Sequence, residues 1–553
     1  MLDPIHHECG VAATYRMGHH GSDSQKDGEK ITGLIPEILT DLQNRGQLSA
    51  GISSYDPHRG QVLDTHKDNG TVAEVFRTAN EVKQRALIRQ YAGRAAIGHV
   101  RYATCGLDDP SYAQPFERHH GRLWKWFAFC FNGNIANYDQ CRQNILSRGD
   151  YHLVRQTDTE IIMHHLSLAL KGEEKPDFKT VFQHLNSTFD GAYTLAFLNA
   201  DGDLIIARDP HGFRPLCYAV KGDVFAAASE SHPLERLNFG PVRNVEPGTL
   251  VHVRPDGYSV KRFADSPKKS FCFFEWVYFS NAASTLNDIS VYVSRRRLGE
   301  ELARAETEKM DENCIIVPVP DTSRAAADAM AHELGIPCYE GLMRNRYVGR
   351  TFIESKSRFD KARRKYTPVA DVLQGKRVFL VEDSIVRSTT LRVIVGMIRG
   401  KGEAKEVHVR VACPPIMAPC SYGIDMSTVS ELFAPRFLDR PVEGGLPVEV
   451  ARNMAKDLGA DSLRYLPLDA LAKCIGLPEH DLCMGCLTSQ YPTEWGNRLY
   501  QIAERHRNER VPDGVVPEGR RTYESIGREE QPPVPLKGVL PDVVPAEGEP
   551  EKN

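Results

Sequence analysis

Two carboxylates and a run of hydroxyls follow one strongly apolar stretch in the second half of the chain. Residues 377–390 read RVFLVEDSIVRSTT, and the apolar residues at its start predict a strand buried on both faces. Glu382 and Asp383 stand at the carboxyl end of this strand, and a helix is predicted after the hydroxyls. A helix N-terminus can bind phosphate, and an acidic pair can hold ribose hydroxyls or Mg²⁺. The stretch therefore suits a ribose 5-phosphate, although an ordinary core strand followed by a capped helix shows a similar pattern.

Cysteine is the other residue type that could do chemistry here. The chain holds 13 cysteines, an odd and scattered set that does not suit a secreted disulfide framework. Catalytic or metal-binding use fits better. Cys483 and Cys486 form a C-x-x-C pair, which is equally compatible with zinc and with a redox pair. Cys9, in ECGVAA, taken alone is more often a small core residue than a nucleophile.

Two different kinds of fold are predicted to position these residues. Residues 9–262 contain many short β-rich segments, such as AAIGHVRYAT and AYTLAFLN, which predict stacked, mainly antiparallel sheets with outer helices. In residues 263–495 strands and helices alternate, which predicts a doubly wound α/β domain with its site at the strand ends. Residues 496–553 form a helical extension followed by a Pro- and Glu-rich tail, which we expect to be disordered.

Composition excludes several classes of protein. A chain of 553 residues is too long for a single core and predicts two or three domains. The formal net charge of −4 gives no sign of a nucleic-acid partner. No apolar run is long enough to span a membrane, and the N-terminus lacks the pattern of a signal peptide. These features predict a cytoplasmic protein.

The stretch at 377–390 resembles the phosphoribosyl pyrophosphate (PRPP) signature of the type I phosphoribosyltransferases, most closely the version in the glutamine PRPP amidotransferase family. Glu382 replaces an Asp of that version, and Ser388 replaces a Gly. Glycine at the latter position would leave more room beside a phosphate than serine does. PVPDTSR (318–324) lies after a predicted buried strand and before a helix, so it is a second anion site fitted for pyrophosphate. RNRYVGRTFI (344–353) matches the family's mobile PRPP loop, which would close over the pyrophosphate.

The resemblance implies a set of residues that contact PRPP or a Mg²⁺ ion. The expected PRPP contacts are Asp321, Ser323, Arg346, Arg350, Lys365, Glu382, Asp383, Ser384, Arg387, Ser388, Thr389 and Thr390. Of these, Ser323, Glu382 and Asp383 are the expected Mg²⁺ ligands.

Five segments of the first half, in their order, resemble the glutaminase domain of the N-terminal-nucleophile amidotransferases. They are RGQLSAGI (45–52), GHVRYAT (98–104), FNGN (131–134), TDTE (157–160) and RDPHGFRPL (208–216). The implied roles are Cys9 as nucleophile, Arg101 for the glutamine α-carboxylate, Asp158 for its α-ammonium, and Asn132 with the N–H of Gly133 as oxyanion hole. The family usually has His where Phe131 stands, and acidic or small residues at Leu48 and Ser49.

Amide hydrolysis by Cys9 requires a base that accepts the thiol proton near neutral pH. An α-amine, with a pKa of about 7.7 to 8.0, serves better than a lysine at about 10.4. We therefore expect Cys9 to become residue one of the mature protein and residues 1–8 to be a propeptide removed by self-cleavage after Glu8.

Four cysteines lie in segments that align with the cluster ligands of iron-sulfur members of the same family. They are Cys272, Cys420, Cys483 and Cys486. This set implies a [4Fe-4S] cluster, for which four thiolates are the usual ligands. A structural role is expected, because the implied reaction is not a redox reaction.

The resemblance covers residues 9 to about 495 and implies glutamine hydrolysis with internal ammonia transfer to PRPP, the first committed step of purine biosynthesis. The products would be 5-phosphoribosylamine, glutamate and pyrophosphate. It also implies feedback by purine nucleotides and a homotetramer or homodimer. Two alternatives are another glutamine amidotransferase and a PRPP- or nucleotide-sensing regulator without full catalysis. Another glutamine amidotransferase would not need the PRPP-like strand at 377–390. A regulator without catalysis would not need Cys9 and the glutaminase motifs that accompany it.

Overall fold

The computed structural model describes residues 9–18, 24–102, 109–155, 157–266, 268–345, 365–424, 426 and 428–506. The predicted propeptide, residues 346–353 of the predicted PRPP loop with Arg346 and Arg350, and the predicted disordered tail lie outside the described residues.

Two antiparallel sheets, of seven and six strands, make up the first half. In the first sheet the order is β11-β9-β10-β1-β4-β2-β3 and in the second β13-β12-β8-β7-β6-β5. The strands of the first sheet are β1 (Gly10–Arg16), β2 (Ser49–Tyr55), β3 (Leu63–Asn69), β4 (Ala95–Arg101), β9 (Cys217–Lys221), β10 (Val224–Ala228) and β11 (Arg243–Asn244). Those of the second are β5 (Phe116–Arg118), β6 (Phe127–Ile135), β7 (Gly191–Asn199), β8 (Leu204–Arg208), β12 (Thr249–Arg254) and β13 (Gly257–Arg262).

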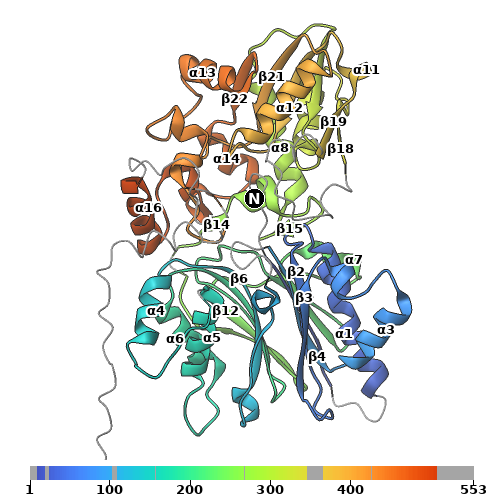
Figure 1. Ribbon diagram of the computed structural model, residues 1–553, viewed down its shortest axis with the longest axis vertical. Coiled ribbons are helices and arrows are strands. Elements are labelled where there is room, and N and C mark those ends of the chain that lie inside the picture. Colours follow the sequence, from blue (N-terminus) through green and yellow to red (C-terminus); the bar gives the residue numbers. More distant parts are fainter. Residues whose placement is uncertain are drawn as a thin grey trace, which may run out of the picture.

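Helices cover the outer face of each sheet, so the first half has four layers (Figure 1). On the first sheet lie α1 (Ser24–Asp41), α2 (Val72–Val75) and α7 (Ser231–Arg236), with α3 (Glu81–Gln90) packed on the outside of α1. On the second lie α4 (Tyr138–Leu146), α5 (Asp158–Ala169) and α6 (Phe178–Thr188). Apolar side chains from both sheets fill the space between them. Strands such as β7 are buried along their whole length because helices and sheet cover both faces.

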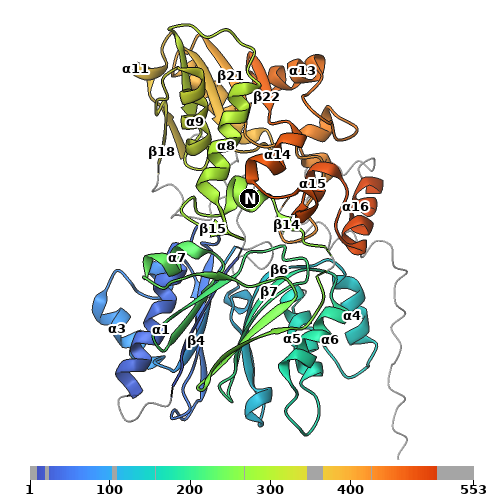
Figure 2. The same cartoon turned by 180° about the vertical axis from the view of Figure 1, so that it is seen from behind.

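The second half is built on a parallel four-stranded sheet with the order β17-β20-β21-β22 (Figure 2). Its strands are β17 (Cys314–Pro318), β20 (Arg377–Glu382), β21 (Glu406–Val411) and β22 (Ser462–Tyr465). A parallel bridge from Ile316 to Cys338 extends the sheet on the far side of β17. The chain therefore leaves β17 in one direction and returns to β20 in the other, and ligands of doubly wound sheets bind at such a reversal.

Helices and short strand pairs complete the second half. The helices are α8 (Val291–Arg304), α9 (Arg324–Leu334), α11 (Ala370–Leu373), α12 (Thr389–Gly400), α13 (Val448–Leu458), α14 (Leu468–Ile475), α15 (Gly485–Thr488) and α16 (Glu494–His506). The strand pairs are β14 (Phe271–Cys272) with β23 (Leu482–Cys483), β15 (Thr285–Leu286) with β16 (Ile289–Ser290), and β18 (Leu342–Arg344) with β19 (Tyr366–Pro368).

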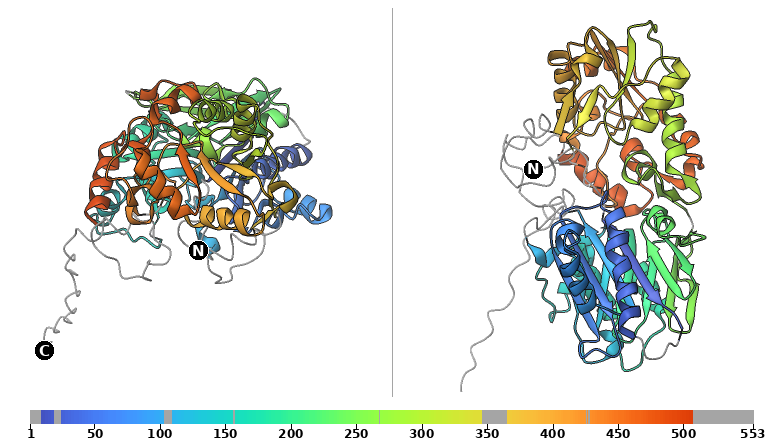
Figure 3. Two further views of the ribbon diagram at one scale, coloured as in Figure 1. Left: turned by 90° about the horizontal axis from the view of Figure 1, so that it is seen from above. Right: turned by 90° about the vertical axis from the view of Figure 1, so that its right-hand side faces the viewer.

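The two halves stack along the long axis of the molecule (Figure 3). The predicted combination of stacked antiparallel sheets and a doubly wound α/β sheet is confirmed. Among the described helices, none has the length and apolar character needed to cross a membrane.

Candidate active sites and cysteine cluster

A cavity of about 450 Å³ lies at the carboxyl ends of β17 and β20. Residues 319–322 follow β17, and residues 382–387 begin with the last residue of β20; both segments line the cavity. Further lining residues are Arg344, Lys365 and Tyr366 from the β18–β19 pair and its approach, and Thr390 and Leu391 from α12. The cavity therefore occupies the reversal point of the sheet.

Glu382 and Asp383 bring two carboxylates into this cavity. Burial raises the pKa of Asp383 to about 6, against the hydrogen bond from Ser384, whose hydroxyl donates to Asp383 Oδ1 at 2.7 Å. Burial and the neighbouring Asp383 charge raise the pKa of Glu382 well above its usual value. Ionising two adjacent buried carboxylates is unfavourable, because both are desolvated and their negative charges repel each other. A bound divalent cation or hydroxyl donors would relieve this cost.

The structure brings most of the expected PRPP residues to the cavity. Those that line it are Asp321, Lys365, Glu382, Asp383, Ser384, Arg387 and Thr390. Ser323 does not line it, because the hydroxyl is buried and donates to the carbonyl of Val319 at 2.5 Å. Such a bond to the fourth preceding residue is common for serine at the start of a helix. The geometry thus gives no support to the prediction that Ser323 ligates Mg²⁺.

Ser388 and Thr389 also stay outside the cavity lining. Ser388 precedes α12 in a helical conformation, with φ of −78°, so the substitution of glycine causes no left-handed strain there. Its hydroxyl faces Arg436, whose Nη1 lies 3.4 Å away.

Several lining residues were not predicted from the sequence. They are Asn44 and Gln47 from the first half, and Tyr278, Ser280 and Arg295 from the second. Asn44 precedes, and Gln47 belongs to, the segment RGQLSAGI (45–52), which the sequence assigned to the other active site. Only the stacking of the two halves brings them to this cavity.

Cys9 directly precedes β1, the middle strand of the seven-stranded sheet. Its Sγ lies 4.0 Å from the carbonyl oxygen of Tyr102, just beyond the end of β4. Arg101, the last residue of β4, is buried and lies over the ring of Tyr112 at 5.6 Å. The same ring lies 5.9 Å from Arg155, close to the start of α5. The end of β4 and the start of α5 therefore meet beside Cys9.

Asn132 and Gly133 lie in β6 of the opposite sheet. The Nδ2 of Asn132 is buried and has no hydrogen-bond partner among the described residues. Gly133 has φ of +146°, and a Cβ there would lie 2.0 Å from the carbonyl oxygen of Ala192. Burial raises the pKa of Cys130, two residues earlier, and the charge of Cys9 adds to this effect, so β6 passes near Cys9. A buried amide donor without a partner beside a thiol suits an oxyanion.

Asp158 is the first residue of α5 and is buried. Its Oδ1 accepts a hydrogen bond from the N–H of Thr159 at 2.9 Å. Glu160 accepts the N–H of Val154 at 2.8 Å and fixes the chain that enters this helix. These bonds hold the carboxylate of Asp158 rigidly at the helix start.

The four predicted cluster cysteines come together at the junction of the two halves. Cys272 in β14 stands directly opposite Cys483 in β23, and Cys486 follows in α15. Burial raises the pKa of Cys486, and the charges of Cys420, Cys483 and Cys272 add to it in that order. All four are buried free thiols.

Within the described residues, no group of three or more His, Cys, Asp or Glu side chains is arranged to hold a metal ion. A [4Fe-4S] cluster binds one thiolate at each of four irons, so its ligands stand farther apart than those of a single ion. Four free buried thiols from separate segments are the donor set of such a cluster. Their chemistry therefore fits the cluster.

A fully buried ion network joins the two halves beside these cysteines. Arg45 donates to Glu230 Oε1 at 2.6 Å and to Glu275 Oε2 at 2.6 Å. Arg214 Nη1 lies 3.7 Å from Glu275 Oε1, and its Nη2 donates to the carbonyl of Tyr422 at 2.6 Å. Buried charges require such pairing to remain ionised. The network thus ties the first half, through Arg45, Arg214 and Glu230, to Glu275 and Tyr422 of the second half.

Comparison with known proteins points to one family. A model described as glutamine amidotransferase domain matches residues 99–236. The amidophosphoribosyltransferase of Pyrococcus horikoshii is 40% identical, with 88% of this chain and 97% of that protein covered. That of Methanothermobacter thermautotrophicus is 37% identical, with 88% and 95% covered. The solved structure of glutamine PRPP amidotransferase from B. subtilis with ADP and GMP has a TM-score of 0.74 at 34% identity, and covers 88% of this chain and 98% of its own.

Proposed function

This chain belongs to the amidophosphoribosyltransferase family, and we propose that it performs the family's reaction, the first step of purine biosynthesis, with the residues assigned below. Water and glutamine give glutamate and ammonia at the first site. The ammonia then replaces the pyrophosphate of PRPP at the second and gives 5-phosphoribosylamine. No comparison supports the alternative of a non-catalytic sensor.

Cys9 is the nucleophile of the glutamine site in this proposal. Its thiolate attacks the carboxamide carbon, and the α-amine freed by cleavage after Glu8 accepts the thiol proton. The same amine, now protonated, gives its proton to the departing ammonia, and water then releases glutamate. Arg101 binds the α-carboxylate of glutamine, and Asp158 binds the α-ammonium.

Asn132 and Gly133 stabilise the oxyanion of the tetrahedral intermediate. The supporting observation is the buried Nδ2 of Asn132, which has no partner within the described part of the chain. A donor held without a partner is ready for a charge that exists only during reaction, and such donors contribute most when they need no reorganisation.

Glu382 and Asp383 carry the proposal for the second site. The pair would hold the ribose hydroxyls of PRPP and a Mg²⁺ ion, which stabilises the charge of departing pyrophosphate. Asp321, Ser384, Arg387 and Thr390, which line the cavity, would surround the phosphates, with Arg346 and Arg350 closing over the pyrophosphate. Ammonia released inside the protein reaches PRPP without dilution, and such proximity corresponds to effective molarities of about 10⁵ M or more.

Cys272, Cys420, Cys483 and Cys486 would hold a [4Fe-4S] cluster that links the two halves structurally. Anaerobically purified protein is then expected to be brown, with about four irons and four sulfides per chain. Stoichiometric zinc without iron would contradict this assignment. Control by purine nucleotides is also proposed, because a solved relative binds ADP and GMP. A homo-oligomeric state and a cytoplasmic location stay predictions.

The decisive experiment compares Cys9→Ser with the unchanged protein in two assays. Glutamine-dependent release of pyrophosphate from PRPP should fall by orders of magnitude, because a hydroxyl is a weak nucleophile near neutral pH. Synthesis with ammonium at high pH should persist, because it bypasses the first site. The mass of the purified N-terminus should correspond to a chain that begins at Cys9. Full glutamine turnover by a chain that retains residues 1–8 would disprove the terminal-amine mechanism.

A further inference from the structure

The backbone of Phe131, one residue before Asn132, is held by side chains on two sides. Strand β5 pairs with β6 as far as Phe116 opposite Phe129. Beyond that point the side-chain amide of Gln114 takes the place of a strand. Its Oε1 accepts the N–H of Phe131 at 2.7 Å, and its Nε2 donates to the Phe131 carbonyl at 3.4 Å.

His99 reaches the same carbonyl from the opposite sheet. It lies in β4, is completely buried, and its Nε2 is 3.1 Å from the oxygen of Phe131. A carbonyl oxygen can only accept, so Nε2 carries the proton. Burial lowers the pKa of His99 to about 3, so the ring stays uncharged at any pH at which the enzyme works. The Nδ1 of the ring has no partner among the described residues.

The bonded carbonyl belongs to the peptide that joins Phe131 to Asn132. On the other side, the hydroxyl of Thr194 donates to the Asn132 carbonyl at 3.3 Å. Both peptide units around Asn132 are therefore fixed by hydrogen bonds from side chains. The orientation of these units determines where the amide of Asn132 and the N–H of Gly133 point.

We propose that His99 and Gln114 are positioning residues of the glutaminase reaction, which hold the Phe131 peptide so that Asn132 and Gly133 face the oxyanion. This inference rests on the proposed roles of Cys9, Asn132 and Gly133. Phe131 in place of the family's usual His is tolerated because its ring packs in the core. The three positioning hydrogen bonds use only its backbone N–H and carbonyl.

His99→Ala tests the proposal most directly. It should lower kcat for glutamine hydrolysis by roughly 10- to 100-fold, somewhat less than the loss of an oxyanion donor itself. KM for glutamine should change by less than about 3-fold, because Arg101 and Asp158 bind the substrate. Ammonia-dependent synthesis should be unchanged and so reports a folded protein. His99→Gln, which restores an N–H donor, should recover most of kcat.

Two further measurements separate positioning from other roles. The pH profile of hydrolysis should keep its shape, because an uncharged ring is not the base; loss of one limb in His99→Ala would make His99 a proton carrier and overturn the proposal. Alkylation of Cys9 by iodoacetamide needs no oxyanion hole and should proceed at the same rate in the variant.

An unchanged kcat in His99→Ala would also overturn the proposal. If this variant loses ammonia-dependent synthesis as well, Gln114→Met decides instead, with the same expected fall in kcat, and an unchanged kcat there would refute the inference. A separate result would show that the proposed role of Cys9 itself is wrong: glutamine hydrolysis by the unchanged protein would then survive alkylation of Cys9.

Discussion

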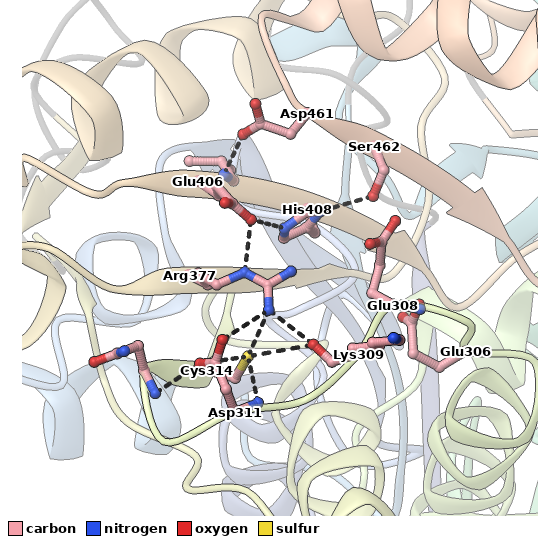
Figure 4. Close-up of polar contacts among 12 residues, drawn as sticks. Glu306, Glu308, Lys309, Asp311, Cys314, Arg377, Glu406, His408, Asp461 and Ser462 are labelled. Carbon is pink, nitrogen blue, oxygen red and sulfur yellow. Dashed lines mark hydrogen bonds and ion pairs between the residues drawn. The ribbon is translucent and has the colours of Figure 1, made fainter.

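The two ends of the parallel sheet in the second half carry charge in opposite ways. At the carboxyl ends of β17 and β20, Glu382 and Asp383 face a cavity and their pKa values are raised. At the amino ends, acidic and basic side chains are paired with one another in a continuous network (Figure 4). At the carboxyl ends, ionisation of Glu382 and Asp383 is unfavourable without a partner, so these carboxylates can bind a ligand. At the amino ends, the acidic and basic side chains are already paired within the protein, so the pairs stabilise the fold.

Arg377, the first residue of β20, is the centre of the network at the amino ends (Figure 4). It donates to Glu406 Oε2 at 2.6 Å, to Asp311 Oδ2 at 3.1 Å and to the carbonyl of Lys309 at 2.7 Å. His408 continues the network, with Nε2 at 3.0 Å from Glu406. The hydrogen bond from Arg377 is the main reason that the pKa of Glu406 is lowered.

A second ion pair joins this network through Ser462, whose hydroxyl oxygen lies 2.8 Å from His408 Nδ1 and 3.0 Å from Arg410 Nη1. Arg410 of β21 donates to both oxygens of Glu306, and both side chains are completely buried. Arg464 adds a partly exposed charge 3.5 Å from Glu306. The buried charges of Arg410 and Glu306 thus have partners of opposite sign, which is the condition for keeping them ionised.

The largest effect is expected at the carboxyl end. Asp383→Asn should reduce PRPP-dependent synthesis by roughly 10³-fold or more, because a charge that orients Mg²⁺ and ribose is lost. Slow glutamine hydrolysis should remain, because the first site does not use this residue. Steady-state assays of both reactions check the division. Equal loss of both in a folded variant would contradict it.

Breaking the buried ion pair between Arg410 and Glu306 should lower the stability of the fold and leave the activity nearly unchanged. Arg410→Met leaves Glu306 largely uncompensated, and we expect the free energy of unfolding to fall by about 3 kcal/mol. Urea unfolding measures this loss, and kcat below the unfolding transition should stay within about 2-fold. Arg452→Ala, which removes an exposed pair with Glu449, is the matched control and should cost less than about 0.5 kcal/mol. A large fall in kcat would show that the two ends are not separate.

A smaller loss is expected at the edge of the network. Arg377→Met removes ion pairs whose acidic partners, Asp311 and Glu406, are partly exposed. Solvent screens such pairs, so we expect about 1 kcal/mol of destabilisation and no change in kcat. Addition of 1 M salt should shrink the difference between Arg377→Met and the unchanged protein. A salt-independent difference would indicate lost packing instead.

The two ends should also differ in how the stability contributions of Asp383, at the carboxyl ends of the strands, and Glu406, at the amino ends, change with pH. The pKa of Asp383 is raised to about 6 in the folded protein, above its unfolded value of about 3.9. The folded state therefore binds this proton first, and its burial penalty is relieved as pH falls from above 6 towards 4. Without Mg²⁺, Asp383→Asn should be more stable than the unchanged protein at pH 7, by roughly 3 kcal/mol, and nearly equally stable near pH 4.

Glu406 titrates with the opposite sign. Its pKa is lowered by Arg377, so its contribution is present above the unfolded value of about 4.3 and disappears as pH falls through the lowered value. Thermal unfolding of Asp383→Asn and Arg377→Met across pH 4–7 compares both groups. If both variants differed from the unchanged protein in the same direction at pH 7, the proposed contrast would be wrong.

Much of the chemistry could be predicted from the sequence because it is local. An apolar strand that ends in Glu382 and Asp383 places both carboxylates at a sheet edge whatever packs around it. The five glutaminase segments and the four cluster cysteines were likewise recognised from short motifs. Family membership followed from these motifs, and the comparisons confirmed it.

Tertiary structure alone decided which side chains share a site. Asn44 and Gln47 reach the cavity of the second half only because the halves stack. Ser323 looked like a ligand in the sequence, but its hydroxyl bonds to the preceding turn. His99 meets the Phe131 carbonyl across two sheets, 32 residues further along the chain. Motifs report on a few neighbouring residues, whereas these contacts depend on how distant segments pack, and no local pattern encodes that.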